Sequence, residues 1–402
     1  MAEKGKYIPA GIDVGNSSIV AAIAHDYGSC IPAAIASCPT IGMRRGDITD
    51  PDGLANCIGE ALEKAERAAG LKVSAVRVGF TGYTAELNPV SARFTSGSAR
   101  RVNQSDLDRL QRLVAIEDIP SGRQILKVIP FEYTVDSACV VKTPLGMKFK
   151  SLELTAGLLT VDSKLIDLLT GVLQRLSLQP RSFIPSTLAA AGEVLKSTEM
   201  QLGTALVDLG AVSTGVAVYN YGTQLGFRLL PVGGEHITGD LAVGMRTTLE
   251  AAGQIKIQAG LGTTDHDTFE VPGISNTGTH EIKCQFAREI IEARVCEVLD
   301  LVRAAVESMA ADLVLPGGLV LTGGGAALKG LDEYAAEYLG MPVRIASSRT
   351  PGMTDKSAED CSCTAAVGLL QNYGKDEFRT YNKGRRGMWK SLIKFFEATR
   401  QK

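Results

Sequence analysis

Apolar runs at residues 8–14 and 19–24 flank a short polar turn, a pattern typical of a β-hairpin. The same pattern returns about half the chain length later, in residues 205–219, where Asp208 takes the place of Asp13. An internal repeat of this kind indicates duplication. The sequence therefore predicts two similar lobes with a cleft between them.

A helix with clear end signals follows the first hairpin. Asp50 can cap its first turn, Pro51 suits the first helical position, and Gly70 can end it. Another apolar run, at residues 73–80, predicts a strand after this helix. The order strand, strand, helix, strand indicates an α/β fold.

Three further segments complete the pattern. Residues 319–326 form an apolar strand that enters a glycine turn, before a helix expected to start near Leu331. Residues 86–160 interrupt the repeated strand and helix pattern of the lobes. They contain a polar helix at 104–116 and strand-like stretches, which predicts an inserted α+β module. Residues 262–281 are polar and rich in turn formers, so we expect a surface loop or an irregular hairpin.

These patterns predict two lobes, an insertion and a tail. We expect a first lobe (8–85 and 161–203), an inserted subdomain (86–160), a second lobe (204–232 and 316–373), a subdomain of the second lobe (233–315), a linker (374–386) and a terminal amphipathic helix (387–402).

Charge is distributed unevenly along the 402 residues. Residues 379–402 contain eight basic residues and one acid, a net charge of +7, whereas the rest of the chain carries −9. An acidic body offers no basic face for coating nucleic acid, so we expect no nucleic-acid partner. The basic tail predicts an anionic partner of its own.

Some classes of protein are disfavoured by what the sequence lacks. No run of 18 apolar residues occurs, and the first residues lack an apolar signal segment, so we expect a cytosolic protein. The eight cysteines form no CxxC pair and the four histidines are scattered, which disfavours a zinc site or a disulfide framework.

Glycine turns follow three of the predicted strands, and two of these turns carry an aspartate. Turns without β-carbons let backbone N–H groups converge on phosphate oxygens, although a single glycine turn is often only a tight connection. Asp13 and Asp208 could hold Mg²⁺ beside a polyphosphate, usually through its waters. The P-loop and dinucleotide-binding glycine motifs are absent. Together the three turns predict a nucleotide cleft of another kind.

The tail contains an amphipathic stretch at residues 387–400. Fourteen residues make about 21 Å of helix, too short to span a bilayer but suited to its interface. Docking on the globular body is the alternative, but the polar linker and the basic surroundings favour an anionic membrane surface. The residues expected at the membrane are Arg385, Arg386, Met388, Trp389, Lys390, Leu392, Ile393, Lys394, Phe395 and Phe396.

Several sequence strings carry a resemblance to a known family. They are IGMRRG (41–46), IPFEYTVD (129–136), PLGM (144–147), EVPG (270–273), EIIEAR (289–294) and LTGGGAALKG (321–330). With the glycine turns, they resemble the actin-like ATPase superfamily and, within it, the FtsA family of bacterial cell-division proteins. The resemblance covers about residues 8–372 and the tail. It implies an actin-like two-lobed α/β fold of duplicated ribonuclease-H-like domains, with a small inserted α+β subdomain and a C-terminal amphipathic helix.

The resemblance also implies ATP and Mg²⁺ as cofactors, with Asp13 and Asp208 facing the metal. It implies that the residues around the nucleotide are Asp13, Gly15, Asn16, Ser17, Asp208, Gly210, Ser213, Thr214, Gly233, Gly234, Lys256, Gly323, Gly324 and Gly325.

Some positions depart from the family pattern. Asn16 stands where a small hydroxyl residue is common, and Ala211 and Val212 replace two expected glycines. Gly192 stands where an amide or an acid would orient the attacking water, with Glu193 beside it as a substitute. These departures favour nucleotide binding as a structural switch over fast hydrolysis, and no catalytic residue is assigned.

By resemblance, the protein forms filaments at the cytoplasmic face of the cell membrane, at the division site, as a peripheral membrane protein. Its partners would be FtsZ, bound by the lobe containing residues 233–315, further copies of itself, and later cell-division proteins. The inserted module would serve subunit contacts or those later proteins.

Two other interpretations remain open. One is a related actin-like scaffold of pilus assembly or a divergent FtsA paralogue; the pilus relatives are not expected to end in a basic amphipathic helix. The other is a small-molecule kinase of the same superfamily. It would need a catalytic carboxylate near an acceptor hydroxyl, which the sequence does not indicate.

Overall fold

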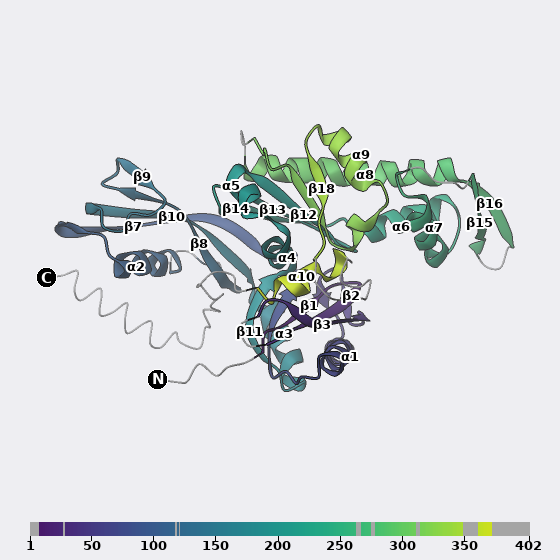
Figure 1. Ribbon diagram of the computed structural model, residues 1–402, viewed down its shortest axis with the longest axis horizontal. Helices are drawn as coiled ribbons and strands as arrows, with labels where there is room; N and C mark the ends of the chain where they lie inside the picture. The colour runs from purple at the N-terminus through teal and green to yellow at the C-terminus, as the bar shows by residue number, and fades with distance from the viewer. Residues whose placement is uncertain are drawn as a thin grey trace.

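The computed structural model describes residues 8–26, 29–116, 119, 121–262, 267–274, 278–310, 314–348 and 361–371. Two lobes face each other, and an arm built mainly of strands projects to one side (Figure 1). The expected linker (374–386) and amphipathic helix (387–402) lie outside the described residues. Within the described part of the chain, no helix is long and apolar enough to cross a membrane.

The first lobe is built on a five-stranded sheet with the order β11-β6-β1-β2-β3. The predicted hairpin is confirmed as β1 and β2, and β1 also pairs in parallel with β6. Helices α1 and α3 pack against each other, and their apolar side chains join the core of this lobe. The bounds are β1 (Ala10–Val14), β2 (Ser18–Ala24), β3 (Pro32–Pro39), β4 (Met43–Arg44), β5 (Asp47–Ile48), α1 (Pro51–Ala69), β6 (Ala75–Phe80), α3 (Ser163–Arg175) and β11 (Gln179–Pro185).

Helix α1 begins and ends where the sequence predicts. The Asp50 carboxylate accepts hydrogen bonds from the first free backbone N–H groups, and Pro51 fills the first helical position. Gly70 ends the helix with φ 67°, a conformation that glycine adopts without steric cost.

The second lobe repeats the first, with the strand order β14-β13-β12-β17-β18. β12 and β13 form the second predicted hairpin, and β12 pairs in parallel with β17, as β1 does with β6. The predicted duplication is therefore confirmed. The bounds are α5 (Ser197–Leu202), β12 (Thr204–Leu209), β13 (Thr214–Asn220), β14 (Thr223–Leu230), β17 (Leu319–Thr322), the 3₁₀ helix η2 (Gly324–Ala327), α9 (Leu331–Leu339) and β18 (Val343–Ile345).

A helical subdomain extends from the second lobe, and the long helix α8 runs from it along that lobe (Figure 1). The polar stretch that we expected to be a loop or hairpin contains a two-stranded hairpin. The bounds are α6 (Gly234–Gly244), α7 (Leu249–Ala259), β15 (Thr268–Pro272), β16 (Thr279–Lys283) and α8 (Cys284–Met309).

The arm is a four-stranded antiparallel sheet, β7-β10-β8-β9, with α2 packed on it around a core of its own. It is the inserted α+β module expected from the sequence. The bounds are β7 (Glu86–Arg101), α2 (Gln104–Val114), β8 (Arg123–Val135), β9 (Cys139–Val141) and β10 (Lys148–Asp162).

Two short helices pack together where the lobes meet (Figure 1). Helix α4 (Ser186–Val194) connects the lobes along the chain, and α10 (Thr364–Gly368) follows the short 3₁₀ helix η4 (Cys361–Cys363). We expected residues 316–373 to belong to the second lobe because they follow it in sequence. β17, α9 and β18 do lie in the second lobe, but the apolar side chains of α10 pack against α4, β1 and β2, so residues 361–371 return to the first lobe.

Candidate functional site

A cavity of about 320 Å³ lies between the lobes, within the size range of small-molecule sites. The glycine turns after β1, β12 and β17 all reach it, so the structure brings together three segments that are far apart in sequence. The predicted site residues that line it are Asp13, Gly15, Asn16, Ser17, Asp208, Gly210, Ser213, Gly234, Lys256, Gly323, Gly324 and Gly325.

Two further predicted contact residues make hydrogen bonds within the second lobe. The buried Thr214 hydroxyl donates a hydrogen bond to the Val232 carbonyl oxygen at 2.7 Å. The Gly233 backbone N–H donates to His236 Nδ1 at 3.0 Å, which satisfies a free donor at the start of α6. Neither residue is among those that line the cavity.

Two carboxylates, one from each lobe, face this cavity. Burial raises the pKa of Asp13 to about 7; a hydrogen bond from Ser186 opposes the rise, and the charge of Asp208 adds to it. Burial likewise raises the pKa of Asp208 to about 6, opposed by a hydrogen bond from Thr187. The charge of Asp208 thus reaches Asp13 across the cleft, and a cation bound beside them would favour the ionised form of each carboxylate.

Carboxylate oxygens are ligands that suit Mg²⁺. Gly323 makes room beside one of them, because a β-carbon at this residue, whose φ is 82°, would lie 2.5 Å from Asp208 Oδ1. The described part of the chain contains no cluster of three or more His, Cys, Asp or Glu side chains that could hold a metal. The residues therefore fit a cation that takes its remaining ligands from phosphate oxygens and water, and whose charge would neutralise phosphate charge.

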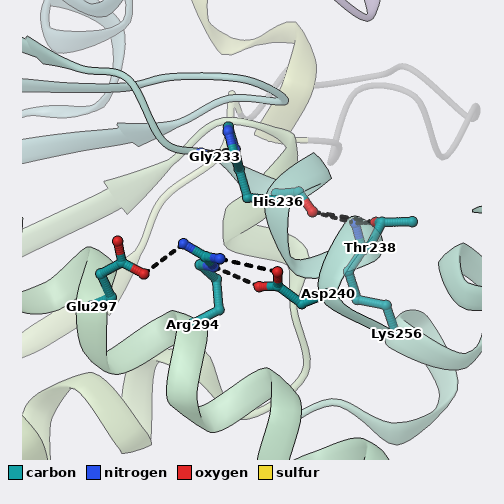
Figure 2. Close-up of polar contacts among 8 residues, drawn as sticks. Gly233, His236, Thr238, Asp240, Lys256, Arg294 and Glu297 are labelled. Carbon is teal, nitrogen blue, oxygen red and sulfur yellow. Dashed lines mark hydrogen bonds and ion pairs between the residues drawn. The ribbon is translucent and has the colours of Figure 1, made fainter. Parts of the chain in front are cut away.

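Lys256 provides a cationic group at the same cavity. Its Nζ donates to the Gly234 carbonyl oxygen at 3.0 Å and to Thr238 Oγ1 at 2.9 Å, which fixes the side chain of α7 against the start of α6. Burial lowers its pKa, and the charge of Glu235 partly opposes this. Figure 2 shows Lys256 and Thr238 side by side near the start of α6.

Arg294 joins helix α8 to α6, on the side of α6 away from Lys256 (Figure 2). Its Nε lies 2.6 Å from Asp240 Oδ2 and its Nη2 lies 3.0 Å from Asp240 Oδ1, a bidentate pair. A third contact joins Nη1 to Glu297. Arg294 does not line the cavity, so its role is to hold α6 on α8.

The turns around the cavity are also held to one another. Asn16 Oδ1 accepts a hydrogen bond from the Gly46 backbone N–H at 2.8 Å, which joins the first glycine turn to the β4–β5 turn. Tyr83, from the first lobe, donates from its hydroxyl to the Val212 carbonyl oxygen of the second lobe at 3.0 Å. This hydrogen bond crosses the cleft beside the turn in which alanine and valine replace glycines.

Sequence reasoning missed several hydroxyl residues that also line the cavity, among them Ser186 and Thr187 at the start of α4. In sequence they look like ordinary helix-start residues, and only their meeting with distant aspartates distinguishes them. Gly192 and Glu193, considered for orienting the attacking water, lie near the other end of α4, and Glu193 accepts a hydrogen bond from Gln371. Neither is among the residues that line the cavity.

Comparison with known proteins gives family matches over two parts of the chain. Residues 205–368 match the family "Cell division protein FtsA", and residues 86–160 match "SHS2 domain inserted in FTSA". The cell division protein FtsA of Bacillus subtilis is 31% identical over 368 residues, which cover 90% of this chain and 82% of the relative. FtsA of Pseudomonas aeruginosa is 29% identical, covering 92% of this chain and 90% of the relative.

Solved structures support the actin-like fold. A PilM-PilN type IV pilus biogenesis complex matches with a TM-score of 0.66 at 17% identity, covering 91% of this chain and 98% of that chain. MreB5 of Spiroplasma citri bound to ADP matches with a TM-score of 0.55 at 14% identity, covering 96% and 98%. At these identities the structural likeness to the pilus protein concerns the fold alone, whereas the sequence matches identify the family. This chain belongs to the FtsA family of actin-like cell-division proteins.

Proposed function

We propose that this cell-division protein binds ATP with Mg²⁺ in the cleft between its lobes. The observation that supports this most is the pair of facing carboxylates, Asp13 and Asp208, in a cavity lined by three glycine turns. The glycine turns would receive the phosphates, and Lys256 would add a positive charge to the site. The other contacts are the cavity-lining residues given above.

Equilibrium binding of a fluorescent ATP analogue tests this proposal. Asp208→Asn keeps the size of the side chain but removes a charge that faces the metal, so we expect weaker binding in the presence of Mg²⁺. Asp332→Asn makes the same change at the start of α9, outside the residues that line the cavity, and should bind as the wild type does. Equal binding by all three proteins would refute the site.

We propose further that the nucleotide acts as a structural switch with slow or absent hydrolysis. Among the described residues, the cavity lining contains no glutamine and a single glutamate, Glu235, whose charge acts on Lys256. Its aspartates are the two carboxylates proposed to face the metal. Turnover of ATP on the order of tens per minute or faster, by the purified protein without a partner, would contradict this part of the proposal.

Residues 387–402 are proposed to form the membrane anchor, which places the protein as a peripheral component at the cytoplasmic face of the membrane. The support is the sequence pattern: an apolar stripe with basic neighbours and a net charge of +7 in the last 24 residues. Co-sedimentation with anionic liposomes, comparing the full chain with one that ends at Lys383, tests the anchor. Equal pelleting of the two proteins would rule it out.

We propose that the anchored protein assembles into filaments and tethers FtsZ filaments to the membrane at the division site. The helical subdomain (233–315) is the proposed FtsZ-binding part, and the inserted arm (86–160) the part for subunit contacts or later division proteins. Family membership supports this proposal. Co-pelleting with FtsZ filaments in the presence of ATP tests it, and FtsZ filaments that do not retain the protein would point to a paralogue with another task.

A further inference from the structure

Helix α4 opens with two adjacent hydroxyl residues, and each contacts a carboxylate from a different lobe. Ser186 Oγ donates a hydrogen bond to Asp13 Oδ1 at 2.5 Å, and Thr187 Oγ1 donates to Asp208 Oδ2 at 3.0 Å. Ser186 and Thr187 are only 6% and 3% exposed, so water competes little for these bonds. One helix start therefore holds both of the facing carboxylates.

The surrounding backbone leaves room for both hydrogen bonds. A β-carbon at Gly215 of β13 would lie 1.8 Å from Thr187 Oγ1, so a side chain there would displace the hydroxyl. A β-carbon at Gly79 of β6 would lie 2.6 Å from Asp13 Oδ1. Each contact thus depends on a neighbouring strand that has no side chain at that point.

Ordinary helix capping does not explain these two hydroxyls. A capping hydroxyl accepts a hydrogen bond from a backbone N–H of the first helical turn. The cap position of α4 is Pro185, which makes no side-chain capping bond. Ser186 and Thr187 instead donate to carboxylates that lie 173 and 21 positions away along the chain.

Helix geometry explains how neighbouring residues reach opposite lobes. Successive side chains on an α-helix diverge by about 100°, so Ser186 and Thr187 point to different sides of the helix. α4 is itself tightly held, because α10 packs so closely on it that a β-carbon at Gly368 would lie 2.0 Å from the Ala189 carbonyl oxygen. A firmly packed helix start can set the positions of both carboxylates.

We propose that Ser186 and Thr187 are positioning residues for the cation that accompanies the nucleotide. Each hydroxyl holds one oxygen of its carboxylate, which would leave the other oxygen available to the cation. This inference rests on the proposed nucleotide site and adds the residues that prearrange its metal-facing groups. Its consequence is that these hydroxyls contribute to nucleotide affinity mainly through Mg²⁺.

The test measures the dissociation constant of ATP by competition with a fluorescent ATP analogue, once in EDTA and once in Mg²⁺. The value in EDTA divided by the value in Mg²⁺ shows how much the cation strengthens binding. Thr187→Val keeps the branched shape beside Gly215 and removes only the donor. We expect this ratio to fall about tenfold in Thr187→Val and in Ser186→Ala, because each loses a hydrogen bond to a charged group. Thr187→Ser restores the donor and should recover most of the ratio.

Thr204→Val is the matched control. The Thr204 hydroxyl is also buried in β12 and hydrogen-bonded, but to the Gly318 carbonyl oxygen outside the cavity lining. It should keep the wild-type ratio. A wild-type ratio in Thr187→Val and Ser186→Ala, with circular dichroism matching that of the control, would overturn the positioning role. Absence of any ATP binding by the wild type would instead overturn the nucleotide site itself.

Discussion

Asp13 is buried, which favours its neutral form, although binding a cation would need its ionised form. Its burial raises its pKa to about 7. The hydrogen bond from Ser186 offsets only part of this cost, and the charge of Asp208 adds to it. A bound cation would relieve both effects, so the ligand-free protein carries a local instability that ligand binding removes.

This instability predicts a pH dependence of the ligand-free protein. The folded protein binds a proton at Asp13 that the unfolded chain releases near pH 4, so stability falls as pH rises towards 7. We expect Asp13 to lower the free energy of unfolding by about 2–3 kcal/mol between pH 5 and pH 8. Asp13→Asn should lack this part of the dependence in urea unfolding without nucleotide.

The exposed acid Glu307 on α8 provides the control, because Glu307→Gln removes a carboxylate far from Asp13 in sequence and outside the cavity lining. This variant should keep the wild-type slope. If the free energy of unfolding depends on pH in the same way in Asp13→Asn and in the wild type, burial of the ionised Asp13 does not destabilise the protein. Asp208, whose pKa is raised to about 6, lowers stability with rising pH in the same direction, in both the wild type and Asp13→Asn.

The residue scale also shows what sequence can and cannot predict. The Asp and Gly residues of the cleft were predictable because an apolar strand that enters a glycine turn is a local signal. Thr214 follows one of the same glycine turns, but its hydroxyl donates to the Val232 carbonyl oxygen, which only folding brings near. Ser186 and Thr187 act through partners that are distant in sequence, so no local pattern could reveal them.

At the scale of elements, residues near a helix end determine where the helix begins and ends. Which other helix it packs against depends on contacts in the folded chain. The capping signals of α1 gave its bounds correctly. Nothing local indicates that α10 leaves the second lobe and packs on α4, because that pairing depends on how closely two helix backbones can approach. The close approach at Gly368 is specific to the folded chain.

Gly368→Ala therefore tests the α4–α10 contact. The added β-carbon would lie 2.0 Å from the Ala189 carbonyl oxygen, so the helices must separate. We expect a loss of about 1–3 kcal/mol in the free energy of unfolding. Gly171→Ala in α3, where the new β-carbon meets nothing within 4 Å, should instead stabilise the protein by about 0.5–1 kcal/mol. Similar effects of both substitutions on chemical denaturation would contradict this account.

Arg294 gives a second test at this scale, on the contact between α6 and α8. Arg294→Met removes the bidentate pair with Asp240 but keeps a long apolar stem. Because it leaves a partly buried carboxylate without this partner, we expect a loss of about 1–3 kcal/mol in urea unfolding. Glu297→Gln, at the exposed end of the same network, should change stability by less than about 0.5 kcal/mol. Equal losses would mean that the whole network, and not the bidentate pair, holds the helices.

At the scale of the whole molecule, duplication places the site between two lobes that contribute to it nearly symmetrically. Fold class was predictable because the repeat is visible in sequence, and matching strand orders confirm it. The direction of the arm and the return of α10 were not predictable, because both depend on contacts between segments far apart in sequence.

A ligand held by both lobes should stabilise both. We expect ATP with Mg²⁺ at 100 times its dissociation constant to raise the free energy of unfolding by about 2.7 kcal/mol. Hydrogen exchange should slow in β1 and in β12 together, since the proposed site uses both. Lys256→Met should need more ATP for the same stabilisation. Protection confined to one lobe would contradict a site shared between them.

The arm has a mechanical consequence that follows from its strands. β7 and β10 pair without a register shift from Glu86 and Thr160 to Thr95 and Ser151, and they carry side chains into both the first-lobe core and the arm core. β7 alone has 16 residues, about 50 Å of extended chain. The arm is thus rooted in the first lobe by two long paired strands, so a load applied at its tip would pass along them into the first-lobe core.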